Sequence, residues 1–164
     1  MKRRLLPLLL LLLLLIGCGA KSSALYESAL FDAALPESFR PVSNSQIVCF
    51  APYGDPLLSS SITFYATESN WYFDRFTDAD YEQALRDAGY AIVSFDGVTA
   101  SKIDGFDARR IACQTEIDQG QHMLIVYAVN ADRTYFFTLL NRDGDAYVEP
   151  FDAMMKTVHL KGAQ

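Results

Sequence analysis

The sequence contains few of the residues that most often carry catalysis or bind metals. It has only two histidines, His122 and His159, and three cysteines in 164 residues. No HExxH or CxxC spacing is present, so the sequence predicts no metal site and no cofactor. A GxSxG elbow and a glycine-rich phosphate loop are absent as well. We therefore expect a protein that is not an enzyme.

Basic residues are also scarce. Lysine and arginine number 14 against 20 acidic residues, which gives a net charge of −6. Because no basic cluster follows the first four residues, nucleic acid is excluded as a partner, and no electrostatic attraction to anionic lipids is expected. An acidic surface of this kind is typical of a soluble domain whose copies repel one another.

The first 17 residues have the organisation of an export signal. A basic head at residues 2–4 precedes an apolar core at residues 5–16. This core has roughly a dozen residues, whereas a membrane-spanning helix needs about 20, and small residues follow it, as in a signal peptide. Residues 15–18, LIGC, resemble the lipobox of bacterial lipoproteins. The resemblance implies that Cys18 carries a diacylglycerol thioether, with acyl chains such as palmitate, and anchors the protein to the extracytoplasmic face of the cell membrane.

The alternative for this region is an ordinary signal peptide followed by a cysteine at a chance position. On the lipoprotein interpretation, residues 1–17 are the signal peptide, residues 18–29 are the lipidated N-terminus and tether, and residues 30–164 form a single domain. The mature chain from Cys18 onward has 147 residues, since 17 of 164 are removed. That length suits one domain with a full hydrophobic core.

Two further cysteines, Cys49 and Cys113, occupy inward positions of alternating strand patterns. Exported proteins keep disulfides, so a bridge between this remaining pair is one alternative. The other alternative is two separate buried thiols that pack as small apolar groups. The distance between the two cysteines decides between these alternatives.

Strand patterns dominate the rest of the chain, together with two helices. The helix expected at residues 78–88 has Thr77 as its cap and ends at Gly89, and a second helix is expected at residues 150–156. A turn at residues 118–120 precedes a strand that is apolar on both faces and therefore central. The segment at residues 25–35 fits either a helix at its start or an edge strand at residues 30–35, and we prefer the strand. The other expected strands are at residues 46–51, 59–67, 90–95, 98–103, 106–117, 121–129, 134–140 and 157–160.

Consecutive strands with short turns and few helices predict an α+β fold, in which an antiparallel β-sheet is flanked by two or three helices. The stretches LPESF (35–39), IDGFDARRIAC (103–113) and FDAMMKTVHL (151–160) resemble the landmarks of PsbP-like proteins. This family includes extrinsic subunits of photosystem II and related bacterial lipoproteins of unknown role. The resemblance implies a PsbP-like sandwich for residues 30–164, and a shared fold does not by itself assign a function.

The segment at residues 71–76 is the candidate binding surface. It contains Trp71, Tyr72, Phe73 and Phe76, and four aromatics in six positions exceed what one face of one element can bury. Trp and Tyr are among the residue types that dominate binding hot spots, so we expect some of these side chains to be exposed. The alternative is that they pack the helix at residues 78–88 onto the sheet.

These observations predict a membrane-anchored extracytoplasmic lipoprotein that binds or assembles with another envelope protein through this segment. The alternative is an accessory domain that binds a small ligand in a pocket lined by the same aromatics. A third hypothesis, an envelope hydrolase, would require Cys49 or Cys113 to pair with His122 as an activated nucleophile.

Overall fold

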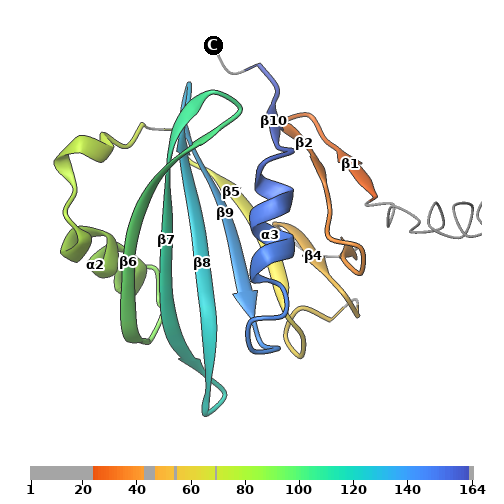
Figure 1. The fold of residues 1–164 in the computed structure, drawn as a ribbon, viewed down its shortest axis with the longest axis vertical. Helices are drawn as coiled ribbons and strands as arrows, with labels where there is room; N and C mark the ends of the chain where they lie inside the picture. The colour runs from red at the N-terminus through yellow and green to blue at the C-terminus, as the bar shows by residue number, and fades with distance from the viewer. Residues whose placement is uncertain (1–23, 43–46, 54, 69, 163–164) are drawn as a thin grey trace, which may run out of the picture.

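The computed structural model describes residues 24–42, 47–53, 55–68 and 70–162, and Cys18 with the expected signal peptide lies outside these residues. The described residues fold into two antiparallel sheets and two α-helices (Figure 1). A short 3-10 helix, Phe73–Arg75, precedes the first α-helix. In chain order, the other elements are β1 (Leu25–Glu27), β2 (Phe31–Ala34), β3 (Arg40–Pro41), β4 (Val48–Ala51), β5 (Ser61–Ala66), α2 (Asp78–Asp87), β6 (Ile92–Ile103), β7 (Phe106–Ile117), β8 (Gly120–Asn130), β9 (Thr134–Asn141), α3 (Val148–Met155) and β10 (His159–Leu160).

The larger sheet has seven strands in the order β3-β4-β5-β9-β8-β7-β6. Short turns join β6 to β7, β7 to β8 and β8 to β9, so these four strands form a meander. The backbone at Asp118 and Gln119 has φ values of +51° and +65°, which are typical of a two-residue hairpin turn. The predicted turn at residues 118–120 is therefore confirmed, and β8 lies near the centre of the sheet as expected.

One edge of this sheet differs from the sequence-based prediction. The strands expected at residues 90–95 and 98–103 are a single strand, β6, which pairs with β7 along its length. Its register shifts between Ile92 and Ser94 and again between Phe95 and Gly97, where Gly97 has a φ of +114°. Irregularities of this kind let a strand bend and remain paired, which explains how one strand spans both predicted segments.

The smaller sheet has the order β1-β2-β10. The prediction of a strand at residues 30–35 is confirmed by β2, and the alternative helix at the start of this segment is wrong. β1 falls within residues 18–29, which the sequence predicts to be a tether, so the folded domain already includes Leu25–Glu27. The β10 strand pairs with β2 through His159 and Leu160, and it thereby brings the C-terminal end of the chain beside its N-terminal strands.

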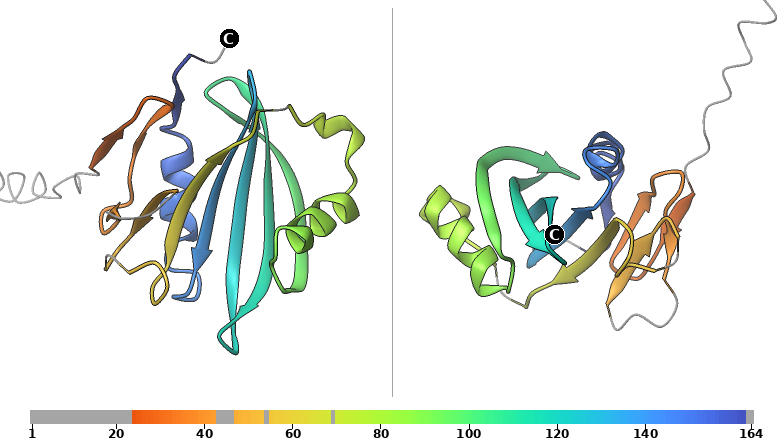
Figure 2. Two further views of the ribbon diagram at one scale, coloured as in Figure 1. Left: turned by 180° about the vertical axis from the view of Figure 1, so that it is seen from behind. Right: turned by 90° about the horizontal axis from the view of Figure 1, so that it is seen from below.

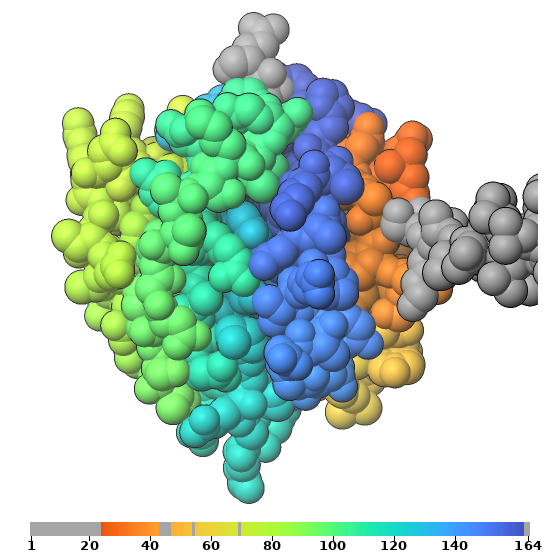
Figure 3. All heavy atoms as spheres, in the orientation of Figure 1, coloured from red at the N-terminus to blue at the C-terminus, as the bar shows by residue number. Residues whose placement is uncertain are grey.

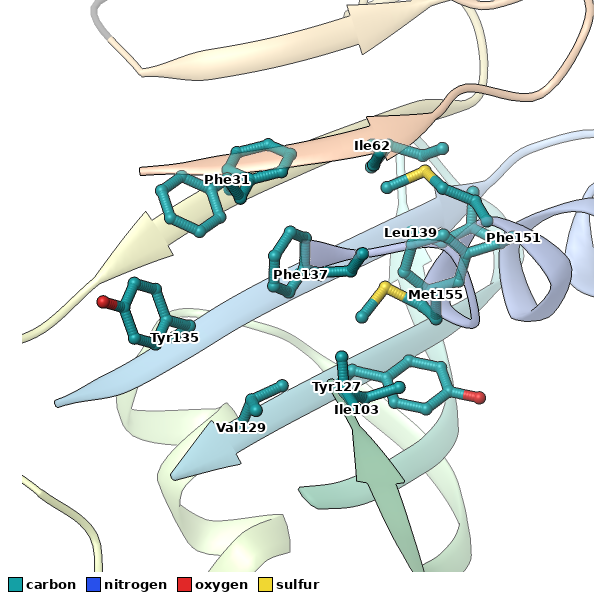
Figure 4. Close-up of a cluster of buried hydrophobic side chains, with 14 of the residues drawn as sticks. Phe31, Ile62, Ile103, Tyr127, Val129, Tyr135, Phe137, Leu139, Phe151 and Met155 are labelled. Atoms are coloured by element: carbon teal, nitrogen blue, oxygen red, sulfur yellow. The ribbon is translucent and has the colours of Figure 1, made fainter. Parts of the chain in front are cut away.

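We call the face of the large sheet that α3 and the small sheet cover its inner face. Figure 3 shows α3 in the middle of this side, between the strands β6 to β8 and the strands β1 and β2. In Figure 4, Phe31 of β2 lies in one cluster with Phe137 and Leu139 of β9 and with Phe151 and Met155 of α3. All five side chains are buried, which makes this cluster the main hydrophobic core.

A polar contact also joins α3 to the inner face. Arg110 of β7 donates two hydrogen bonds to the Asp152 carboxylate of α3, at 3.0 and 3.1 Å. The Tyr127 hydroxyl of β8 donates to the same carboxylate at 2.9 Å. A bidentate pair with a third donor satisfies the carboxylate and fixes the orientation of α3 on the sheet.

The helix α2 covers part of the opposite, outer face (Figure 2). Thr77 caps this helix as predicted: its hydroxyl accepts from the Asp80 N–H, and the Asp80 side chain accepts from the Thr77 N–H. Tyr81 and Leu85 of the helix are buried against Ile111 and Cys113 of β7. An antiparallel sheet between helices on opposite faces is the predicted α+β architecture, which is confirmed. Among the described residues, no helix combines the length and the apolar character that a membrane crossing needs.

Candidate functional site

The outer face of the large sheet is only partly covered. An α-helix is about 10 Å across and strands lie about 4.8 Å apart, so one helix covers two or three strands. The helix α2 packs closest to β6, and its buried Tyr81 and Leu85 belong to one apolar cluster with residues of β7 and β8. The outer surfaces of β5 and β9 therefore extend beyond the helix, and this difference in width creates a groove beside α2.

The floor of the groove consists of paired residues from four neighbouring strands. Thr63 pairs with Thr138, Thr138 with Val126, and Val126 with Ile111, so these four side chains form one row across the outer face. A second row begins with Tyr65 of β5 and Phe136 of β9, which are also direct partners. Pairing in register places both rows on one surface, although their members are far apart in the sequence.

The wall of the groove comes from α2 and from the residues on either side of it. The volume of the groove is about 400 Å³. The residues of the wall and rim are Ile47, Thr67, Trp71, Tyr81, Ala84, Leu85, Ala88 and Tyr90. The small side chains of Ala84 and Ala88 leave space between the helix and the sheet.

Trp71 lines the groove beside Phe136. Its backbone N–H donates to the hydroxyl of buried Thr134 at 2.8 Å, which attaches the segment to the start of β9. Its ring stacks on Phe76, with centroids 5.4 Å apart, and lies edge-on to Phe136 at 5.0 Å. These contacts fix the indole beside the opening before any ligand arrives, which lowers the entropic cost of binding.

The structure separates the four aromatics predicted to form a binding surface. Phe73 is only 6% exposed and lies under the guanidinium of Arg109, 5.0 Å from the ring centroid, so its assignment to the surface is wrong. The 3-10 helix turns this side chain into the core and its neighbour Tyr72 outward, at 63% exposed. Trp71 is half-buried in the groove, and Phe76 lies at its edge, partly exposed.

The groove is apolar, and its polar groups are hydroxyls. None of the described residues that line it carries a charge. Burial raises the pKa of both Tyr81 and Tyr90 above its usual range, so these side chains are neutral. A site of this kind favours an apolar ligand, with the hydroxyls of Thr63 and Thr138 available to orient a polar end.

The cysteines lie near this surface but form neither a disulfide nor a nucleophilic site. Cys49 and Cys113 are both free and buried, and they lie on β4 and β7, which are four strands apart. Four strand spacings amount to about 19 Å, far beyond the reach of a disulfide. The disulfide considered from the sequence is therefore not formed. Burial raises the pKa of the Cys113 thiol to about 11, so it stays protonated and unreactive at neutral pH.

No catalytic or metal-binding constellation accompanies the groove. In the part of the chain that the structure describes, no group of three or more His, Cys, Asp or Glu residues could hold a metal ion. His159, on β10, has its Nδ1 atom 3.0 Å from Oδ2 of Asp104. His122 lies on β8, where it pairs with Thr115 of β7. Neither histidine lines the groove.

Sequence reasoning identified Trp71 but missed the floor of the groove. Tyr65 and Phe136 are 71 positions apart, and only the pairing of β5 with β9 brings them together. One signal was available: Thr63 and Tyr65 alternate with the inward Ile62 and Phe64, so they had to lie on the opposite face. The residues that lie beside Thr63 and Tyr65 on the outer face follow only from the order of the strands in the sheet.

Comparison with known proteins supports the fold. No protein-family profile matches the chain, and no curated protein is similar to it in sequence. Among solved structures, it is similar to the cyanobacterial PsbP protein CyanoP of Synechocystis, with a TM-score of 0.62 and 15% identity over 88% of this chain and 95% of that chain. It is also similar to LpqN of Mycobacterium tuberculosis, which is involved in cell envelope biogenesis, with a TM-score of 0.56 and 11% identity over 79% and 82% of the two chains. At these identities the similarity shows the fold alone, and the chain has the PsbP-like fold that the sequence predicts.

Proposed function

We propose that this chain is a membrane-anchored extracytoplasmic lipoprotein that is not an enzyme and that binds an apolar ligand in the groove beside Trp71. The lipobox-like residues before Cys18 support the anchor. The buried thiols, together with two histidines that do not line the groove, support a binding role over catalysis. LpqN, a protein of the same fold, is involved in cell envelope biogenesis, and this supports an accessory role in the envelope.

The groove is the observation that carries this proposal. At about 400 Å³, it falls within the range of roughly 300 to 1,000 Å³ that is common for small-molecule sites. Its lining is apolar with a few hydroxyls, and its aromatic end is held in place by packing and by the hydrogen bond to Thr134. An apolar surface that stays open in the folded protein is stabilised when a ligand removes it from water.

A second candidate function is the binding of an envelope protein, and the exposed aromatics favour it. Tyr72 lies outside the groove, Phe76 lies at its edge and Tyr65 lies in its floor, and all three rings are exposed to solvent. The Arg75 guanidinium lies over the Tyr72 ring, 4.9 Å from its centroid. Tyr, Trp and Arg are enriched at the centres of protein interfaces, so this rim could extend the groove toward a protein partner.

The first test uses Trp71 itself, because it is the only tryptophan in the sequence. We expect titration with dodecanoate, an unbranched C12 carboxylate, to shift the Trp71 emission to shorter wavelength and to saturate. A folded protein whose emission does not change would contradict the apolar-ligand proposal. Cross-linking in the native membrane, with a Tyr72→Ala, Phe76→Ala variant as comparison, then tests the protein partner: a stoichiometric partner lost in the variant would support it.

A further inference from the structure

The connection between β4 and β5 carries the most exposed apolar side chains of the described chain. Leu58, Tyr53 and Leu57 are 82%, 78% and 74% exposed, and Leu25 at the start of β1 follows at 65%. Single exposed apolar residues are common on protein surfaces. Three large ones within six positions concentrate exposed apolar surface in one loop, and we call them the apolar patch of this loop; apolar surface of this kind indicates an interaction.

Polar contacts hold this loop at its base. The Leu57 N–H donates to Asp55 Oδ1 at 2.9 Å, and the Ser59 hydroxyl donates to the Asp55 carbonyl oxygen at 2.6 Å. The hydroxyl of buried Ser60 donates to Asp143 Oδ2 at 2.7 Å, which connects the end of the loop to the segment after β9. The loop thus has a fixed base, while its apolar side chains remain in solvent.

The loop belongs to the same part of the molecule as the start of the described chain. The Leu35 N–H donates to the Ala24 carbonyl oxygen at 2.9 Å. Five residues later, Arg40 pairs with Ala51, the last residue of β4 before the loop. In Figure 3 the gold atoms of the β4 region lie directly beside the orange atoms of β1 and β2.

The chain between this part of the domain and the expected lipid is short. Only five residues lie between Cys18 and Ala24, so the two are six residue steps apart. A fully extended chain spans at most about 3.5 Å per residue, which gives about 20 Å for this segment. A lipid on Cys18 would therefore hold Ala24 within about 20 Å of the bilayer surface.

We propose that Tyr53, Leu57 and Leu58 insert into the interfacial layer of the membrane that holds Cys18. This inference rests on the lipid anchor of the proposed function, and it is independent of the groove. Leucine side chains are stabilised when they leave water, and the tyrosine ring suits the boundary between acyl chains and headgroups. A second apolar contact beside a lipid strengthens anchoring and restricts rotation of the domain.

Charge favours a bilayer over a second copy of this chain as the partner. Removal of residues 1–17 takes away three basic residues, so 11 basic and 20 acidic residues remain, and the net charge becomes −9. Two copies with this charge repel each other, whereas a zwitterionic bilayer carries no net charge and does not repel the protein. The patch itself is apolar, so it needs no basic residues to meet such a surface.

The test places a tryptophan in the loop and measures its contact with acyl chains. The mature chain is coupled through its Cys18 thiol to a maleimide lipid in phosphatidylcholine vesicles that contain brominated acyl chains, which quench tryptophan on contact. Trp71→Phe removes the native fluorophore, and Leu58→Trp introduces the reporter. Val93→Trp in the same background is the matched control, because Val93 is an exposed apolar residue on β6, at the far edge of the large sheet.

We expect loss of the Leu58→Trp emission in brominated vesicles and unchanged emission from Val93→Trp. Equal emission from Leu58→Trp in brominated and plain vesicles would overturn the inference. A dimer of the uncoupled chain that Leu57→Ser, Leu58→Ser dissociates would also overturn it, because the patch would then bind a second copy. Because the lipid is attached chemically, this test does not depend on whether the cell lipidates Cys18. Intact-mass measurement of the native protein tests the lipid anchor separately.

Discussion

Trp71 stands edge-on to Phe136, with ring centroids 5.0 Å apart and an angle of 74° between the ring planes. The two residues come from different parts of the chain: Trp71 follows β5, and Phe136 lies within β9, the strand that pairs with β5. The contact places the indole at the end of an open apolar groove, where Trp71 serves both the packing of the segment and the lining of the site. Comparison of its substitution with that of the exposed neighbour Tyr72 should therefore separate binding in the groove from contacts on the outer surface.

Trp71→Ala should weaken binding of an apolar ligand far more than Tyr72→Ala does. Truncation of an aromatic hot-spot residue costs about 2 kcal/mol, or about 30-fold in Kd. Tyr72 is the matched control, because it is adjacent and aromatic but points into solvent and does not line the groove. The measurement is calorimetric titration with dodecanoate.

Comparable losses in both variants would contradict a site within the groove and would indicate a contact on the outer surface of this segment. Circular dichroism of both variants checks that the fold is retained. Trp71→Ala is expected to lower the free energy of unfolding as well, because its ring packs on Phe76 and Phe136.

Ala84→Phe should block the groove. Ala84 is a half-buried residue of α2 that lines the opening, so a phenyl ring at this position fills the space between helix and sheet. Ala79→Phe, on the exposed side of the same helix, is the control and should bind like the native protein. The Kd for dodecanoate, measured for both variants, decides the matter: unchanged binding by Ala84→Phe would show that the ligand lies elsewhere.

The elements of this fold follow from local patterns in the sequence. The helix Asp78–Asp87 was predictable because Thr77 and Asp80 form a capping box and Gly89 ends the apolar stripe. The strands β7, β8 and β9 alternate or are apolar on both faces, and the turn between β7 and β8 contains Asp118, a residue type that accepts positive φ. Period and turn chemistry act over a few residues, so the sequence displays them directly.

The site was predictable only in part. Which residues line it depends on the order of the strands and on which way the 3-10 helix directs each side chain. Nothing in the segment around Phe73 distinguishes it from Tyr72, yet the 3-10 helix buries one and exposes the other. The same limit applies to the floor, where Tyr65 and Phe136 meet through a non-consecutive pairing of strands. Long-range pairing depends on the whole sheet, and no local pattern encodes it.

Alkaline pH should unfold this protein through buried groups that must lose a proton. Burial first, and then the hydrogen bond to Asp152 and its charge, raise the pKa of Tyr127 to about 12. In an unfolded chain this pKa is about 10. Between these values the unfolded state releases a proton that the folded state keeps, so this stabilisation is full below about pH 10 and is lost as the pH rises through about 12.

The free energy of unfolding should fall by about 2 to 3 kcal/mol through the ionisation of Tyr127. The Cys113 thiol, whose pKa burial raises to about 11, should lower the free energy of unfolding in the same way, beginning at a lower pH. Urea unfolding at several pH values measures it. Tyr127→Phe removes the titrating hydroxyl and should lessen the loss of stability above about pH 10. An identical alkaline loss in this variant would assign the effect to other groups.

Cys18→Ala should release the protein from the membrane. On the lipoprotein interpretation, the Cys18 thiol carries the lipid and marks the processing site, so the variant can neither be acylated nor be cleaved there. After cell fractionation, the amount of the variant in the stable membrane-anchored form should be lower than that of the native protein. Intact-mass measurement should show no acyl chains. Cys49→Ala is the control, because this cysteine is buried in β4 and its loss should leave both processing and anchoring unchanged. If Cys18→Ala is processed and bound to the membrane as before, then the lipoprotein anchor is wrong, and the five residues between Cys18 and Ala24 no longer place the Leu57–Leu58 loop at a bilayer.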